Sequence, residues 1–358
     1  MPTLSAQKIE DIAFHVFRSA GTSDEDAKTV AAHLRDSNLQ GHDSHGLLRV
    51  LQYEAQIQKG IINPRAKPEI VHETATTAQV DGHSAFGQVV AKFATEVAIN
   101  KARAMNVSCV TMRNVGHLGR LGAYTVMAAQ QGMAAIAFCG SGGSVHIQAP
   151  FGGRDGRVST NPISIAVPSN LQGAVMSDFA TSVVAEGKLR VAIDKGQKIP
   201  NDWVYDKHGN PTTEPKDLYE GGSIRSFGGA VGHKGYCLAF MTEVFAGILS
   251  GDGYAHGGDS DFQAGSRISN GTTIICVNVD AFIPVGTFSE QVGELAQYMK
   301  ASRPAPGFSE VLYPGEKESK TAKERLQQGI EIPGPTWQQV RALVEKYGLT
   351  EELAPLPE

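Results

Sequence analysis

Short runs of β-branched and other apolar residues recur along the chain from about residue 69, and helical segments separate most of them. The clearest runs are EIVHE, TAQVDG, VSCVTMR, MAAIAFC, NPISIAVP, AVMSDFA and TIICVNV. Strands that alternate with helices are typical of an α/β layer architecture. EIVHE and TAQVDG look like a hairpin pair. The sequence therefore predicts an α/β fold, with the α/β domain over residues 69–287.

Helical segments flank this domain on both sides. Ser23 begins a predicted helix, and three carboxylates follow in its first turn, where the helix dipole favours negative charge. The polar segment SNLQGHDSHG interrupts the helical pattern, a further helix runs to Gly60, and the chain returns to helices from Phe288. We expect residues 1–68 to form an N-terminal helical segment that packs with a C-terminal helical segment at 288–358.

Composition and charge limit the possible partners and compartments. The chain has 358 residues and a net charge of −5, without a basic stripe, so nucleic acid is not an expected partner. The longest apolar run, YCLAFMTEVFAGIL, is too short and too polar to span a bilayer, and no membrane partner is expected. The N-terminal segment carries Glu10 and Asp11 where a signal peptide needs an unbroken apolar stretch. Cys109, Cys139, Cys237 and Cys276 lie far apart among apolar neighbours, which predicts the reduced thiols of a cytoplasmic protein.

The familiar nucleotide-binding and metal motifs are absent from the sequence. No predicted strand runs into G-x-G-x-x-G with an acidic residue about 20 positions later, and Gly187-Lys188 lacks the Ser or Thr of a P-loop. GSGGS at 140–144 follows a predicted strand, but its spacing is wrong and an ordinary polar turn explains it equally well. There is no H-E-x-x-H. Motif spacing alone therefore identifies no cofactor.

Three segments nevertheless carry residues suited to chemistry. HDSHG at 42–46 places a titratable group beside a hydroxyl, although a polar turn is the plainer interpretation, and a metal site lacks a third ligand nearby. GHLGRLG at 116–122 lies at a strand-to-helix turn, where backbone N–H groups can approach an anion or a flat ring. Asp178 lies at the carboxyl end of a predicted strand, where α/β sheets place their chemistry, or else it caps the following helix.

Taken in order, several motifs resemble those of a known family. HDSHGLLR, NVGHLGRLG, APFGGRDGRVSTNPISIAVP, SDFATSVVAEGKLRVAIDKGQKIP, DKHGNPTTEP, GHKGYCLAFMTEVFAGILSG and VLYPGE follow the order seen in the type-2 malate/L-lactate dehydrogenase family, over about residues 5–345. The helical tail ERLQQGIEIPGPTWQQV resembles the hydroxycarboxylate dehydrogenase branch most. The resemblance implies NAD, with NADP possible, bound on a non-Rossmann fold with a mixed sheet. It also implies a homodimer whose clefts draw on both subunits.

The resemblance also implies roles for individual residues. His45 would give and take the proton, with Ser44 and Asp178 as its relay partners, and Asp178 would hold the imidazole in one tautomer. His117 would lie at the substrate. The residues expected to bind the cofactor are His45, Gly119, Arg120, Leu121, Ser141, Met176, Ser177, Asp178, Phe179, Ala180, His233, Lys234, Asn270, Gly315 and Glu316. The glycine-rich loop after residue 140 departs from the family pattern at Ser141.

Arg49 is predicted to bind substrate from its position in the sequence. It follows His45 by four residues, so both side chains would project from one face if HDSHG leads directly into the helix. A guanidinium can hold a carboxylate through two parallel hydrogen bonds. Alternatively, Arg49 pairs with Glu54 or faces solvent.

Together these observations predict an NAD(P)-dependent oxidoreductase that interconverts a small 2-hydroxy acid and its 2-oxo acid, without a metal. A ureidoglycolate dehydrogenase or a reductase of cyclic imines (piperideine- or pyrroline-2-carboxylate) is the alternative within the family. From another class, a metal-dependent lyase or hydrolase would use His42, His45 and His117. A catalytically silent relative is disfavoured because His45 and Asp178 are both present.

Overall fold

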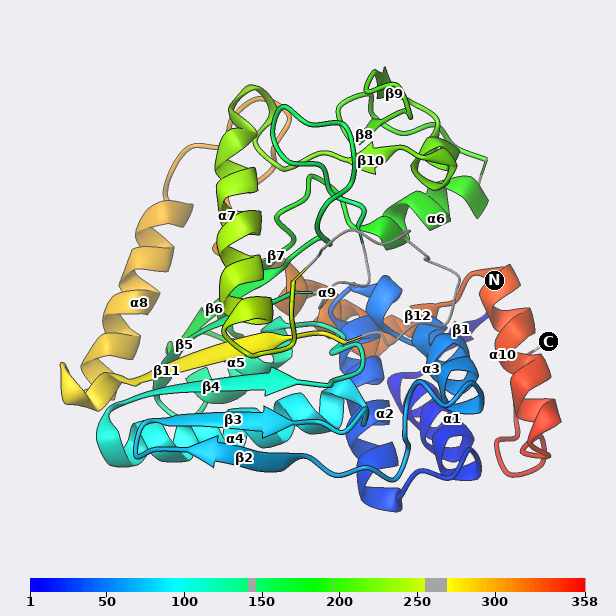
Figure 1. Ribbon diagram of the computed structural model, residues 1–358, viewed down its shortest axis with the longest axis horizontal. Helices are drawn as coiled ribbons and strands as arrows, with labels where there is room; N and C mark the ends of the chain where they lie inside the picture. Colours follow the sequence, from blue (N-terminus) through cyan, green and yellow to red (C-terminus); the bar gives the residue numbers. More distant parts are fainter. Residues whose placement is uncertain (141–145, 195, 255–268, 358) are drawn as a thin grey trace.

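A mixed sheet forms the centre of the molecule (Figure 1). The computed structural model describes residues 1–140, 146–194, 196–254 and 269–357. The strand order is β2-β3-β4-β11-β5-β6-β7, in which β3 and β4 run parallel and the other neighbours antiparallel. The strands are β2 (Glu69–Glu73), β3 (Thr77–Asp81), β4 (Val107–Arg113), β5 (Met133–Cys139), β6 (Ile163–Val167), β7 (Val175–Phe179) and β11 (Thr272–Asn278). The predicted α/β class and the β2–β3 hairpin are confirmed.

Helices cover both faces of this sheet (Figure 1). Along β5, buried side chains alternate with half-buried ones, as expected for period-2 side chains. On one face, the alanine-rich helices α4 (Gly87–Met105) and α5 (Gly122–Ala129) pack closely and share a core with Val80, Met112 and Ile274. On the other face, α7 (His233–Glu243) and the π-helical turn η4 (Val244–Ile248) lie over β5 and β11.

The N-terminal helices share a second core with the end of the chain. Helices α1 (Ala6–Ser19), α2 (Asp24–Leu39) and α3 (Leu48–Gln58) pack against α10 (Gly334–Lys346), and β1 (Thr3–Leu4) pairs with β12 (Ile330–Glu331). Ser23 caps α2 as predicted, because its side chain accepts a hydrogen bond from the backbone N–H of Asp26. Helix α9 (Glu316–Gln328) packs against α2.

Helix α8 (Val285–Lys300) contributes no residue to that core and rises beside the sheet, away from the N-terminal helices (Figure 1). The segment 288–358 therefore does not pack with residues 1–68 as one unit. Helix α10 and β12 do so, whereas α8 does not. The domain boundaries proposed from the sequence stay a prediction.

A small third unit lies between β7 and α7. It contains α6 (Glu186–Asp194), β8 (Val204–Tyr205), β9 (Pro211–Thr212), η2 (Pro215–Glu220), β10 (Ser223–Ile224) and the turn η3 (Gly229–Val231). Its strands form a separate sheet of order β10-β8-β9 over a core that includes Leu189, Val204 and Leu218. This unit brings Gly187 of α6 next to Ser44, since a Cβ added at Gly187 would lie 2.8 Å from the Ser44 Cβ.

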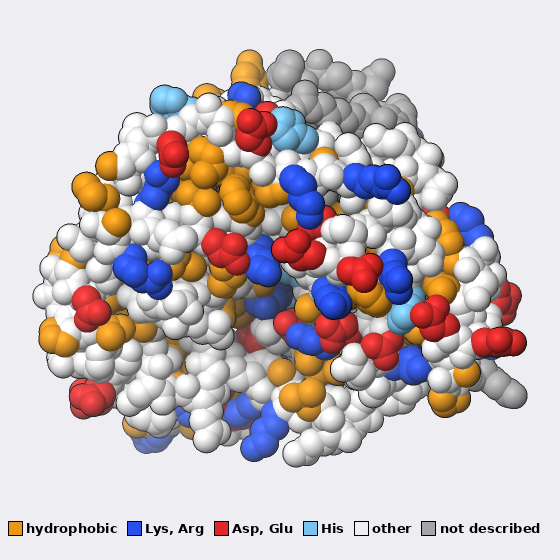
Figure 2. All heavy atoms as spheres, turned by 90° about the horizontal axis from the view of Figure 1, so that it is seen from below, with side chains coloured by type: hydrophobic (Ala, Val, Ile, Leu, Met, Phe, Trp, Pro, Cys, Tyr) orange, Lys and Arg blue, Asp and Glu red, His pale blue; other side chains and the backbone are white. Residues whose placement is uncertain are grey.

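The molecular surface carries charges of both signs. On the face in Figure 2, acidic and basic side chains lie intermingled, and no continuous basic stripe crosses it. Among the helices of the described residues, none has both the length and the apolar character needed to cross a bilayer.

Candidate active site

The HDSHG segment forms a short, tightly held loop between α2 and α3. Asp43–His45 makes a single 3₁₀ turn, η1, in which the Ser44 Oγ lies 3.0 Å from Nδ1 of His45, so the predicted Ser44–His45 contact is present. Asn38 fixes both ends of this loop, because its Nδ2 donates to Asp43 and its Oδ1 accepts from the backbone N–H of Leu47. Arg325 of α9 also donates to the Asp43 carboxylate, at 2.6 and 3.0 Å.

The second motif, at 116–122, meets this loop. The rings of His45 and His117 stack with centroids 5.4 Å apart, and Nδ1 of His117 lies 2.7 Å from the Tyr53 hydroxyl. Burial, followed by the charge of Arg49, holds the pKa of both imidazoles well below the usual 6.5. Both rings are therefore neutral near pH 7. Two segments that lie about seventy positions apart in the sequence supply one histidine each to the same site.

Arg49 adds a cation to this histidine pair. The 3₁₀ turn and α3 are not one continuous helix, but the Arg49 side chain folds back so that its Nε donates to the Ser44 carbonyl at 2.6 Å. Another guanidinium nitrogen donates to the Gln52 side chain. Pairing with Glu54 is wrong, because Glu54 instead accepts from Lys346 and Tyr347.

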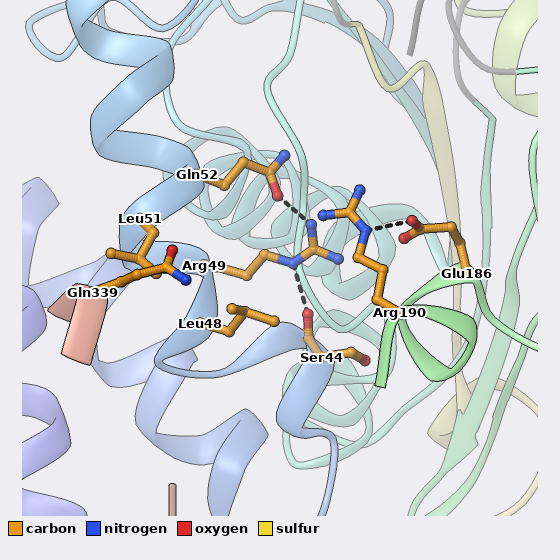
Figure 3. Close-up of a pocket in the computed structure, with 9 residues that line it drawn as sticks. Ser44, Leu48, Arg49, Leu51, Gln52, Glu186, Arg190 and Gln339 are labelled. Carbon is orange, nitrogen blue, oxygen red and sulfur yellow. Dashed lines mark hydrogen bonds and ion pairs between the residues drawn. The ribbon is translucent and has the colours of Figure 1, made fainter. Parts of the chain in front are cut away.

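No carboxylate pairs with Arg49 among the described residues, and burial lowers its pKa from the usual value. Its guanidinium is thus satisfied only by neutral oxygens. Arg49 and Arg190 extend toward each other from α3 and α6, and Glu186 accepts from Arg190 (Figure 3). The pocket of about 260 Å³ between them is lined by Ser44, Leu48, Arg49, Leu51, Gln52, Glu186, Gly187, Arg190 and Gln339.

Asp178 does not make the predicted contact with His45 or Ser44. Its Oδ2 instead accepts from the backbone N–H of Gly122, at 2.7 Å, and Arg120 lies close by. Burial raises the pKa of Asp178 to about 6, against the opposing effects of these two neighbours. The relay contact fails because β7 ends against the N-terminus of α5. Asp178 therefore caps α5, which precedes it in the chain, rather than the helix that follows it.

The loop before α5 holds three of the predicted cofactor residues, Gly119, Arg120 and Leu121. Gly119 has φ +76°, and an added Cβ would lie 2.2 Å from Nε2 of His33. That same His33 nitrogen accepts from the backbone N–H of Arg120 at 2.9 Å, and burial lowers the pKa of His33 to about 3. Within the described part of the chain, Nε of Arg120 is buried without a hydrogen-bond partner. Sequence reasoning missed His33 and Tyr53 because each lies inside an ordinary amphipathic helical pattern.

Two further groups of predicted cofactor residues lie side by side. Met176, Ser177 and Asp178 belong to β7, Phe179 ends that strand and Ala180 follows it. Gly315 has φ +92°, and an added Cβ would lie 2.2 Å from the Ala174 carbonyl, so the YPGE segment runs directly against β7. The Glu316 carboxylate accepts from Lys300 at 2.5 and 2.6 Å and from the backbone N–H of Tyr313. It therefore holds its own loop in place.

The remaining candidates are more scattered. His233 and Lys234 are exposed at the start of α7, where the His233 ring contacts Phe151. Asn270 donates from its backbone to Val115, just before the 116–122 motif. Ser141 lies outside the described residues. In the described ranges, no group of three or more His, Cys, Asp or Glu is placed to hold a metal ion.

An α/β protein with a mixed sheet, a neutral histidine pair and a cation beside it is equipped for proton transfer next to an anionic substrate. A family model described as malate/L-lactate dehydrogenase matches residues 4–341. Hydroxycarboxylate dehydrogenase B of Escherichia coli O157:H7 is 36% identical over 97% of this chain and 95% of its own length. L-sulfolactate dehydrogenase of Methanocaldococcus jannaschii is 36% identical over 98% of both chains.

Solved structures give the same result. The crystal structure of malate dehydrogenase from Entamoeba histolytica superimposes with a TM-score of 0.93 at 30% identity, covering 100% of this chain and 99% of that chain. The chain belongs to the malate/L-lactate dehydrogenase family. It is an oxidoreductase of 2-hydroxy acids, which overturns the alternative of a metal-dependent lyase or hydrolase.

Proposed function

We propose that the protein transfers a hydride between NAD(P) and C2 of a small 2-hydroxy or 2-oxo acid, with Arg49 holding the substrate carboxylate. The observation that carries this proposal is a half-buried guanidinium with only neutral acceptors, in a pocket beside Ser44 and next to His45. A partly desolvated cation that makes no direct ion pair is costly, and a bound carboxylate offsets that cost. The proposed substrate is therefore an anion that binds through its carboxylate at Arg49.

His45 exchanges the proton with the substrate oxygen. Because its imidazole is neutral in the free enzyme, it accepts the hydroxyl proton when a 2-hydroxy acid is oxidised. The reverse reaction needs the imidazolium. A carboxylate on Arg49 cancels part of the positive charge that lowers the His45 pKa, so the bound substrate itself favours the charged form. Ser44 holds Nδ1 and leaves Nε2 to transfer the proton.

The residues before α5 fit a nicotinamide cofactor. The unpartnered Nε of Arg120 is a buried donor that suits a carboxamide oxygen, and the positive φ of Gly119 sets the path of the loop beside it. We assign to the cofactor the adjoining wall formed by Met176 to Phe179 of β7 and by Ala180 after it, with Gly315 beside β7. When bound, the nicotinamide supplies or accepts the hydride. NAD is the proposed cofactor and NADP the second choice.

A screen of NADH oxidation against 2-oxo acids and cyclic imines tests this function, and Arg49→Met tests its anchor. We expect turnover with a 2-oxo acid. In Arg49→Met, kcat/KM should fall by about 30-fold or more, since removing one partner of a desolvated charge pair costs ~2–5 kcal/mol. Arg49→Lys should mainly raise KM, because lysine offers only a point charge.

Arg113→Met is the matched control, since Arg113 pairs with Asp81 on β3 and does not line the pocket. We expect its kcat/KM to stay near that of the wild type. An unchanged kcat/KM in Arg49→Met would remove Arg49 from the site and leave Arg120 as the next candidate anchor. If only cyclic imines were turned over, the proposed substrate would be a cyclic imine and not a 2-oxo acid.

We further propose that the protein is a homodimer. Large apolar side chains on α7, on η4 and directly after η4 are exposed, among them Phe240 at 56%, Ile248 at 53% and Leu249 at 52%. Exposed apolar surface on one helical stretch is typical of an interface. Light scattering should give twice the 38.1 kDa chain mass, and Phe240→Asp should shift the protein toward monomer with lower activity. A fully active 38.1 kDa species would contradict this proposal.

A further inference from the structure

A series of buried hydrogen bonds leads to His117, and the function proposed above does not use it. Tyr53, on α3, is fully buried, and its ring packs against Phe17 and Phe86. Its hydroxyl lies 2.7 Å from Nδ1 of His117 and 2.9 Å from Nε2 of Gln88, in the first turn of α4. Three separate parts of the fold therefore converge on one hydroxyl group.

The donors and acceptors of this series can be assigned in order. A glutamine Nε2 only donates, so the Tyr53 oxygen accepts from Gln88. The single hydrogen of the Tyr53 hydroxyl is then directed to the other neighbour, Nδ1 of His117. An Nδ1 that accepts a hydrogen bond has no proton, and in a neutral imidazole the proton is then on Nε2.

The surrounding groups keep both partners in the required protonation state. Burial, followed by the charge of Arg49, holds the pKa of His117 well below its usual value. Burial also raises the pKa of Tyr53 to about 12, so the hydroxyl keeps its hydrogen. In the described ranges, Nε2 of His117 makes no hydrogen bond, and it is not among the fully buried atoms that lack a partner.

We propose that Tyr53 and Gln88 are positioning residues that hold His117 as the neutral Nε2–H tautomer, so that His117 donates a hydrogen bond to the substrate oxygen while His45 transfers the proton. The inference rests on the proposed function and gives the two stacked histidines different roles in it. A neutral imidazole donor polarises a carbonyl without competing for the transferred proton. Without a fixed tautomer of His117, the two neutral histidines could exchange the roles of hydrogen-bond donor and proton-transfer group.

The other tautomer of His117 would require the reverse order of donors and acceptors. The Oε1 of Gln88 is buried and has no partner among the described residues. If the amide turned over, Tyr53 would donate to Oε1 and accept from Nδ1–H of His117, whose Nε2 would then be a base. The tautomer of His117 therefore decides between a hydrogen-bond donor and a proton acceptor at this position.

Two-bond ¹H–¹⁵N correlation spectra of the full-length, histidine-labelled enzyme read this tautomer directly. His117→Asn identifies the His117 signals by their loss. We expect a pyridine-type Nδ1 and a pyrrole-type Nε2 for His117 in the free wild-type enzyme at pH 7. A protonated Nδ1 in the wild type would overturn the proposal, even if the enzyme reduces 2-oxo acids. The proposed function is tested separately by that activity.

Two variants test the assigned positioning residues. In Tyr53→Phe the fixed tautomer should be lost and the acid limb of kcat/KM should move to higher pH, because the lost bond favoured the neutral ring. The kcat should fall about tenfold, the effect of one buried hydrogen bond. In Gln88→Met both tautomers should appear, because nothing then directs the hydroxyl.

Tyr124→Phe is the matched control, since that buried hydroxyl donates to the Leu118 carbonyl rather than to a histidine. It should leave the His117 tautomer unchanged. If Tyr53→Phe folds with a wild-type melting temperature and retains the single Nε2–H tautomer, Tyr53 does not position His117. A single unchanged tautomer in Gln88→Met would in the same way remove Gln88 from the proposal.

Discussion

At His45, burial and a neighbouring cation act in the same direction. Both disfavour the imidazolium, and the pKa of His45 is lowered well below 6.5. The compensating contact comes from Ser44, which holds Nδ1 without adding charge. Among the described residues, Asp178 included, no carboxylate makes a hydrogen bond or ion pair with His45, so none of them stabilises the imidazolium directly. The charged form of His45 therefore depends on what binds at Arg49.

His45→Ala tests this residue directly. Turnover should fall by about 10²–10⁴, the usual contribution of a positioned acid–base group, whereas NADH affinity should change little. Steady-state kinetics and fluorescence titration with NADH give the two values. Near-normal turnover would move the proton-transfer role to another group, with His117 as the first candidate.

At the scale of elements, glycine places the loop before α5 close to His33 of α2. Gly119→Ala combines a positive φ with an added Cβ 2.2 Å from Nε2 of His33. We expect the free energy of unfolding to fall by about 2–4 kcal/mol, the sum of overpacking and left-handed backbone strain. NADH affinity should fall as well. Urea denaturation and fluorescence titration measure the two effects.

Gly21→Ala is a control for the backbone strain alone. Gly21 has φ +97°, and nothing lies within 4 Å of an added Cβ. Its loss of stability should be about 1 kcal/mol, with NADH affinity unchanged. Equal losses in the two variants would show that the close approach of His33 has no energetic weight.

The elements also show what the sequence could and could not predict. The runs VSCVTMR and MAAIAFC coincide with β4 and β5, because β-branched and apolar residues bounded by polar turns mark a half-buried strand. Strands β8, β9 and β10 have two residues each, which is too short for any periodicity. The Ser44–His45 contact is local and was predictable. Where β7 ends relative to η1 is set by the packing of distant elements, so the expected contact of Asp178 with His45 failed.

At the scale of the whole molecule, the buried neutral histidines make the stability of the fold depend on pH. The pKa of His33 is lowered to about 3, and the pKa values of His45 and His117 lie well below 6.5. Below pH 6.5 the unfolded chain binds protons that the native state does not, so the free energy of unfolding decreases. Each histidine contributes a slope of about 1.4 kcal/mol per pH unit.

Asp178 acts with the opposite sign. Its pKa is raised to about 6, so the native state binds its proton before the unfolded state does as the pH falls from about 6 to 4. Over this pH range, Asp178 therefore offsets the effect of about one histidine on the free energy of unfolding. The free energy of unfolding, measured in urea at fixed protein concentration, should therefore still decrease between pH 7 and pH 5. In His33→Gln the decrease should be smaller. A constant or rising value in the wild type would contradict the assignment of three neutral histidines.

The ion pair between Asp43 and Arg325 joins residues 282 positions apart. During synthesis, the turn that bears Ser44 and His45 leaves the ribosome well before its partner on α9. The partner strand of β1, β12, emerges later still. A nascent chain that ends before α9 therefore has Ser44 and His45 but lacks the ion pair that holds their turn in place. We therefore expect activity to be acquired only after α9 has been made, so that a nonsense codon ahead of α9 removes activity even though both histidines of the site have already been synthesised.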